Sequence, residues 1–212
     1  MMKVHQMSSI TLLPPPHETA DEGQIIEDWS RGLDWVKWLL GSVRARVEVL
    51  LAEDARVWND FAETLLREAV GPALKTAWQC AHANDLSGLI SASAKLSSQL
   101  LPDACQRSVQ AGAVLLKSTK HARYQAVLGR LREAVEQGRC DCHIAVVWAA
   151  VGHFFQLSLT NVIAEYVRLE WDIVTRDTPA PVPSAGKYSI AGLTSRIMYE
   201  ASGESALRVV DA

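Results

Sequence analysis

The sequence lacks the patterns that mark β-structure, nucleotide binding or a membrane span. It has no alternation of Val, Ile, Thr and Tyr with polar residues, and no Asn-Gly or Asp-Gly pair that would mark a hairpin turn. The phosphate-binding patterns G-x-x-x-x-G-K-[ST] and G-x-G-x-x-G do not occur, nor does the G-x-S-x-G elbow of serine hydrolases. The longest apolar run, residues 144–159, is shorter than the ~20 residues that a membrane helix needs. We therefore expect a protein that is neither an enzyme nor membrane-embedded.

Excess basic charge and a disulfide pattern are also missing. The net charge of −3 and the absence of a Lys/Arg run argue against nucleic acid or an anionic membrane as partner. Because 49% of the residues are hydrophobic, the chain can build an ordinary core without disulfides. The short apolar segment before the prolines at 14–16 makes a poor signal peptide. We expect a cytoplasmic protein with reduced thiols, at Cys80, Cys105, Cys140 and Cys142.

Helical periodicity is what the sequence has in abundance. Apolar residues recur every three or four positions from about residue 24 to 176, which predicts an all-α, single-domain bundle of about eight or nine helices. Residues 1–22, with three prolines, predict a flexible N-terminal tail. The helical domain is expected over 23–176. Residues 177–212 are expected to form a Pro-rich loop, a short helix near 191–200 and a C-terminal tail.

Several helix ends can be placed from single residues. Asp85 and Ser158 are expected N-caps, because their side-chain oxygens can accept from the first free backbone N–H groups. Pro72 and Pro102 are expected in first turns, where a missing N–H costs little. Gly138 is expected to close the helix over 121–137.

One short segment could bind a metal. Cys140, Cys142 and His143 place three soft or borderline donors within four residues, which suits nickel, zinc or copper. The spacing is not that of a zinc site, and a helix-start loop with small apolar thiols explains the segment equally well. His153, on an apolar face, is expected to pack in the core. Glu165, Glu170 and Asp172 lack a Glu-x-x-His partner and are expected on solvated faces.

The chain has seven tryptophans, and two of them share a helix face. Trp35 and Trp38 are three residues apart, so their side chains lie on the same side of the expected helix. Core packing explains such a pair, and so does a protein interface, where tryptophan is enriched.

The order of motifs resembles that of the UreF family. The family has a "PAL..AW" helix, matched by residues 72–78, and a helix of the form "R.aS..mG..LL", matched by 107–116. It continues with "H..vvfg", matched from His143, and "lgLsL...l.aYl", matched by 156–167. An earlier element, "S.GLE", resembles residues 30–34. The matching positions that we single out are Ser30, Gly32, Ser108, Gly112, His143 and Tyr166.

The chain departs from the family pattern near both ends. Residues 23–28 do not match the family's apolar opening. The tail after the last long helix is only weakly similar to the family's Gly/Gln-rich segment. Those family regions are associated with partner docking, so the resemblance makes Lys187 and Tyr188 in the tail possible interface residues, in addition to Trp35 and Trp38.

The resemblance implies a fold, a set of partners and a role. UreF-like proteins are helical, dimerise, bind UreD (also called UreH) and recruit the GTPase UreG, and the assembly delivers nickel to apo-urease. By resemblance, this chain is expected to be a homodimeric, non-enzymatic urease accessory protein with no resident cofactor and with transient nickel at most. In structural terms, Gly112 would allow close helix packing, Tyr166 would pack with its hydroxyl bonded and His143 would orient the start of its helix.

Two other classes of function remain open from the residues alone. A helical adaptor or assembly chaperone for another client would show the same apolar helix faces without a catalytic set. A helical metal-binding protein would use Cys140, Cys142 and His143, with His153 as a further donor.

Overall fold

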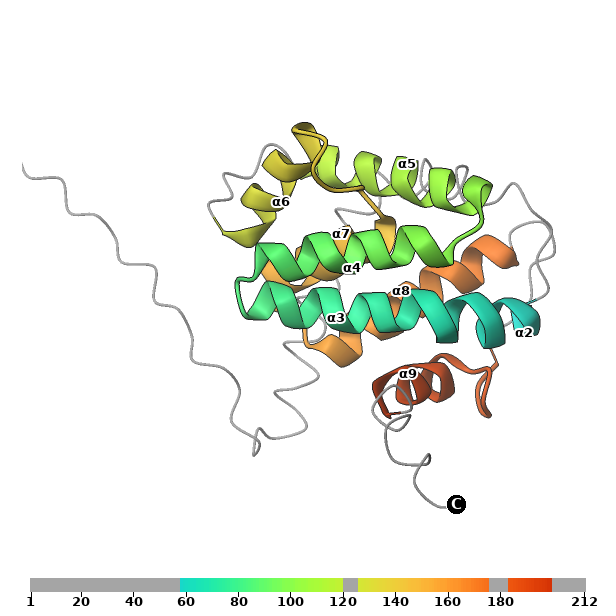
Figure 1. The fold of residues 1–212 in the computed structure, drawn as a ribbon. Helices are drawn as coiled ribbons and strands as arrows, with labels where there is room; N and C mark the ends of the chain where they lie inside the picture. Colours follow the sequence, from blue (N-terminus) through green and yellow to red (C-terminus); the bar gives the residue numbers. More distant parts are fainter. Residues whose placement is uncertain (1–57, 120–125, 176–182, 200–212) are drawn as a thin grey trace, which may run out of the picture.

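The helices pack around one helix that is apolar on every side. The computed structural model describes residues 58–119, 126–175 and 183–199. Helix α7, Ile144–Phe154, is buried without a break from Ile144 to Gly152. Because it exposes no polar face, it must be surrounded. Helices α3 (Gly71–His82), α5 (Pro102–Ser118) and α8 (Leu159–Val174) pack against it (Figure 1).

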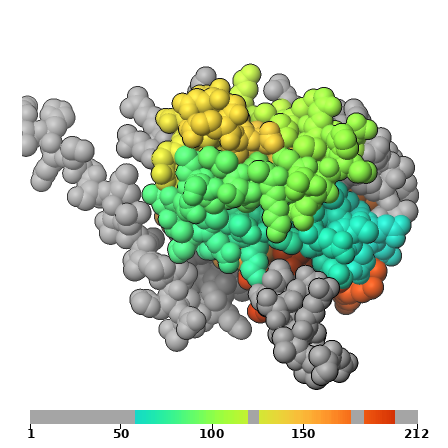
Figure 2. Space-filling view, viewed as in Figure 1, coloured from blue at the N-terminus to red at the C-terminus, as the bar shows by residue number. Residues whose placement is uncertain are grey.

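The remaining helices complete the outside of this body. Helix α4, Leu86–Gln99, packs on α3, and α6, Val127–Glu136, packs on α4 and α7. Helix α9, Ile190–Tyr199, packs on α8 below α3. In the space-filling view α3, α4 and α5 cover the face turned toward the reader (Figure 2). All the elements of the described residues are helical and form one body, so the all-α prediction is confirmed.

Most of the predicted helix ends are where the sequence placed them. Asp85 caps α4 by accepting from the Gly88 N–H at 3.0 Å, and Ser158 caps α8 by accepting from the Asn161 N–H at 3.2 Å. Gly138 follows α6 with a φ of 68°, in the left-handed region that glycine tolerates. The short helix expected near 191–200 is α9, Ile190–Tyr199.

The start of α3 differs from the simple prediction. The chain is helical without interruption from α2, Trp58–Phe61, through a π-helix η1, Ala62–Val70, into α3. Gly71 and Pro72 mark a change of hydrogen-bond pattern there and not a new start. Because Pro72 has no N–H to donate to the preceding turn, it tolerates such a change of register.

Several expectations fall outside the described residues. These are the tail over 1–22, the start of the helical domain and the positions Ser30, Gly32, Trp35 and Trp38. In the described part of the chain, no helix combines the length and the apolar character that crossing a membrane requires.

Candidate functional site

His143 is the centre of a polar network inside the body. It is the N-cap residue of α7 and its side chain is fully buried. Its Nδ1 lies 3.0 Å from Ser108 Oγ on α5, and its Nε2 lies 2.8 Å from Ser97 Oγ on α4. The imidazole therefore connects the start of α7 to two other helices.

The hydrogen bonds of Ser97 assign the proton on this imidazole. The Ser97 hydroxyl donates to Asp141 Oδ2 at 2.6 Å, with Ser93 O as a second acceptor at 3.2 Å, so its oxygen accepts from the His143 Nε2–H. Nδ1 is then the acceptor for the hydroxyl of Ser108. Burial lowers the pKa of His143, while the charge of Asp141 acts in the opposite direction to a smaller extent. The network thus holds a neutral imidazole with both nitrogens bonded.

The network is arranged for support and not for nucleophilic catalysis. In a hydrolase triad the carboxylate bonds the imidazole and the imidazole bonds the nucleophile. Here the carboxylate of Asp141 bonds Ser97 directly, and the imidazole has no exposed surface from which to reach a substrate. The geometry fixes the relative positions of α4, α5 and α7.

Gly112 lies beside this network, and Tyr166 contacts α7 further along, at Trp148. A Cβ built on Gly112 would stand 1.8 Å from the carbonyl oxygen of Cys142, so α5 approaches the start of α7 more closely than any side chain allows. Tyr166 on α8 is buried, and its ring packs edge-on against Trp148 at 5.8 Å between centroids.

The thiols of Cys140 and Cys142 are buried rather than presented to a metal. Burial raises the pKa of Cys140, and it raises that of Cys142 to about 12, so both thiols keep their protons at neutral pH. Metal ligation needs the thiolate. With both His143 nitrogens bonded to serines, the segment offers no ready ligand set, and within the residues that the structure describes no three His, Cys, Asp or Glu side chains converge on a metal position.

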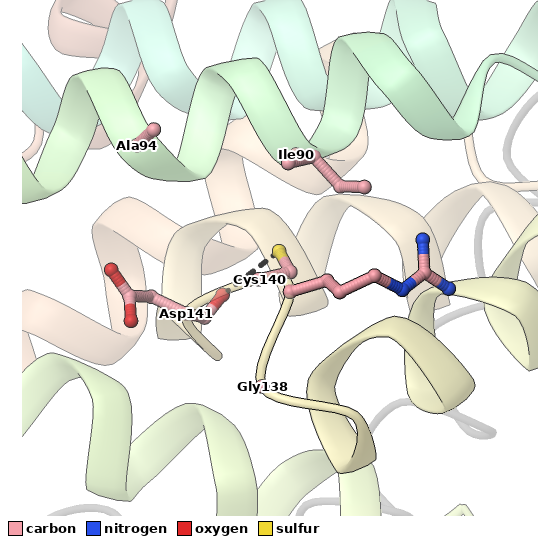
Figure 3. Close-up of a pocket in the computed structure, with 6 residues that line it drawn as sticks. Ile90, Ala94, Gly138, Cys140 and Asp141 are labelled. Carbon is pink, nitrogen blue, oxygen red and sulfur yellow. Dashed lines mark hydrogen bonds between the residues drawn. The ribbon is translucent and has the colours of Figure 1, made fainter.

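A hollow of about 210 Å³ opens beside Cys140 (Figure 3). Ile90 and Ala94 of α4 form one wall and the loop that carries Cys140 and Asp141 forms the other. The Cys140 thiol donates to its neighbour's carbonyl oxygen, Asp141 O, at 3.2 Å. Arg139 and Asp141 also line the hollow, so its lining combines apolar side chains of α4 with one cation and one carboxylate.

A second feature is the ion cluster that fastens the C-terminal segment to η1. Glu63 accepts from both terminal nitrogens of Arg196, at 3.0 and 2.9 Å, and it pairs with Lys187 at 3.2 Å and with Arg67 at 3.2 Å. The hydrogen bonds from Arg196 are the main reason that the pKa of Glu63 is lowered to about 2. One carboxylate thus joins η1, the loop before α9 and α9 itself.

Further contacts hold the same segment. The Trp58 indole donates to Tyr188 O at 3.2 Å, and the Lys75 ammonium donates to Met198 O at 2.7 Å. Gly71 admits Ile197, whose Cγ1 would lie 2.8 Å from a Cβ at that position. Lys187 and Tyr199 remain outward, with 61% of the Lys187 side chain and 75% of Tyr199 exposed.

We expect Glu63→Gln to loosen residues 183–199 while the central body stays folded. The substitution removes the charge that pairs with three cations, so amide hydrogen exchange and limited proteolysis should be faster in this segment. Glu68→Gln is the matched control, because Glu68 is 66% exposed and contacts Arg67 at 3.6 Å. Equal protection of the segment in both variants would contradict the role of Glu63.

Sequence reasoning missed Glu63 and Arg196, and it was wrong about two carboxylates. Glu63 and Arg196 are 133 residues apart, and each reads as an ordinary charge on a helix. Glu165 and Glu170 were expected on solvated faces, but both are buried on α8, with Arg168 3.3 Å from Glu165. A charge at helical spacing does not reveal which face the rest of the chain covers.

Comparison with known proteins identifies the family. The family model UreF matches residues 49–169, more than half of the chain and the part that contains α3, α7 and most of α8. No curated protein and no solved structure gives a significant match. The early element near residue 30 and the tail after 169 lie outside the matched range. UreF proteins are non-catalytic urease accessory proteins, so membership implies an accessory role. The chain belongs to the UreF family.

Proposed function

We propose that this chain is a non-enzymatic scaffold that, with UreD/UreH, recruits the GTPase UreG for nickel insertion into apo-urease. The observation that carries the proposal is the family match over residues 49–169. The buried His143 network supports it, because a network with no exposed imidazole suits a rigid scaffold better than an active site. Nickel is the cargo of the assembly.

The surface around α9 is the docking face that we assign to UreD/UreH. Lys187 and Tyr199 point outward, while Glu63, Trp58 and Lys75 hold the segment that carries them. Fixing exposed groups before binding reduces the conformational entropy lost on association. Residues 177–212 would then form a docking unit, separate in role from the helical domain over 23–176. The homodimer contact is proposed for another surface.

The test is co-purification with UreD/UreH and UreG, read by size-exclusion chromatography. We expect a stable complex with wild-type protein. Lys187→Glu should weaken it by at least about tenfold, because reversing an interfacial charge replaces attraction with repulsion. Lys95→Glu, at an exposed cation on α4, controls for the charge reversal. Glu63→Gln, which also removes the Glu63–Lys187 ion pair, controls for loosening of the segment.

Two outcomes would contradict the proposal. A wild-type chain that elutes alone in the presence of both partners would remove the scaffold role. A complex that forms but is equally affected by Lys95→Glu and Lys187→Glu would retain the role and remove the α9 face as its docking site.

A further inference from the structure

Two histidines and a tryptophan form a compact ring cluster where α3 and α7 end. Trp78 and His82 lie one helical turn apart on α3, and their rings stack with centroids 5.3 Å apart and planes at 6°. His153, at the end of α7, lies edge-on to both rings, with centroids 5.5 Å from Trp78 and 5.4 Å from His82. The three rings are therefore mutually in contact.

The cluster is held in place and is open to solvent. The Trp78 indole donates to Leu157 O at 3.0 Å, which fixes the ring against the turn between α7 and α8. His82 is exposed and His153 is partly exposed, in contrast to the fully buried His143. An ion in solution can thus reach both imidazoles.

Both imidazoles have free nitrogen lone pairs in the described part of the chain. Neither ring makes a hydrogen bond to a described residue, whereas both nitrogens of His143 are bonded.

The two imidazoles are close enough to bind one ion together. With a metal–nitrogen bond of about 2.1 Å and about 1.1 Å from nitrogen to ring centre, two imidazoles on a tetrahedral ion have centroids about 5.2 Å apart. The observed separation is 5.4 Å. We propose that His82 and His153 form a surface site for a divalent transition-metal ion, with water at the remaining positions. Imidazole selects ions of the copper, nickel and zinc class.

The test is titration of the folded protein with Cu²⁺, followed by calorimetry and by electron paramagnetic resonance. His5, His17 and His121 are first replaced by alanine, so that the remaining histidines are His82, His143 and His153. We expect one Cu²⁺ with two nitrogen ligands, displaced by excess Ni²⁺ or Zn²⁺.

His82→Phe and His153→Phe are the deciding variants, because each keeps an aromatic ring in the cluster and removes its lone pair. Loss of a residue that only hydrogen-bonds a metal ligand costs about 10- to 100-fold in metal affinity. Loss of a ligand itself should cost at least as much, so each variant should bind Cu²⁺ at least about tenfold more weakly and through one nitrogen ligand fewer. Circular dichroism checks the fold, and His82→Gln, at an exposed position, replaces His82→Phe if that variant fails to fold. Absence of binding in the parent, or affinity unchanged in both phenylalanine variants, would overturn the proposal.

Discussion

Gly112→Ala is expected to destabilise the fold by about 3–4 kcal/mol, a large fraction of the stability of a domain this size. The added Cβ would lie 1.8 Å from the Cys142 carbonyl oxygen and 2.8 Å from the carbonyl carbon of His143. These are backbone atoms at the start of a buried helix, so no side chain can rotate away to make room. Helix α5 must move off α7, and the Ser108–His143 hydrogen bond should be lost with it. Thermal and denaturant unfolding measure the effect.

Gly138→Ala is the matched control for this steric argument. Gly138 has a φ of 68° with no atom within 4 Å of an added Cβ, so its replacement tests backbone strain alone. We expect a cost of about 1–2 kcal/mol from the left-handed conformation. If Gly112→Ala were no more destabilising than Gly138→Ala, the close approach of α5 and α7 would not be a requirement of the fold.

The features that the sequence predicted are those set by neighbours in the chain. The caps at Asp85 and Ser158 and the turn at Gly138 depend on backbone groups within a few residues. The buried character of α7 follows from its composition, since a helix without a polar face has no orientation that suits solvent. Such features can be read before the tertiary structure is known.

The features that the sequence did not predict depend on contacts between distant segments. The sequence indicated Lys187 as an interface residue but not its ion pair with Glu63. Glu63 pairs with both Lys187 and Arg196 because α9 lies on η1. The π-helix depends on a shift of hydrogen-bond register, which no residue pattern specifies. His143 was expected to orient the start of its helix, but its partners Ser97 and Ser108 lie 46 and 35 residues away.

His143→Ala should be the second most damaging substitution, costing about 3–4 kcal/mol. It removes a fully buried ring, which leaves a cavity, and it deprives Ser108 of its acceptor. Ser97→Ala is the milder control, at about 1 kcal/mol, because it removes one partly exposed hydroxyl and leaves the ring and its hydrogen bond to Ser108 in place. Similar losses for both variants would indicate that the hydroxyl of Ser97, and not the ring, connects the helices.

The pH dependence of the unfolding free energy tests whether the imidazole of His143 is held in its neutral form. Because the folded pKa of His143 is lowered from 6.5, the unfolded chain binds more protons below that pH, and stability falls as the solution becomes more acidic. The pKa of His153 is also lowered, so His153 makes stability fall with acidity in the same way. The comparison is therefore between the His153→Phe protein and the same protein with His143→Asn added. We expect the slope of unfolding free energy between pH 7.5 and 5.5 to flatten when His143 is replaced. This range avoids Glu63, whose contribution is lost as pH falls from 4.5 toward its folded pKa of about 2. An unchanged slope would mean that the buried network accommodates a charged imidazole, with Nδ1–H donating to Ser108 Oγ in place of accepting from it.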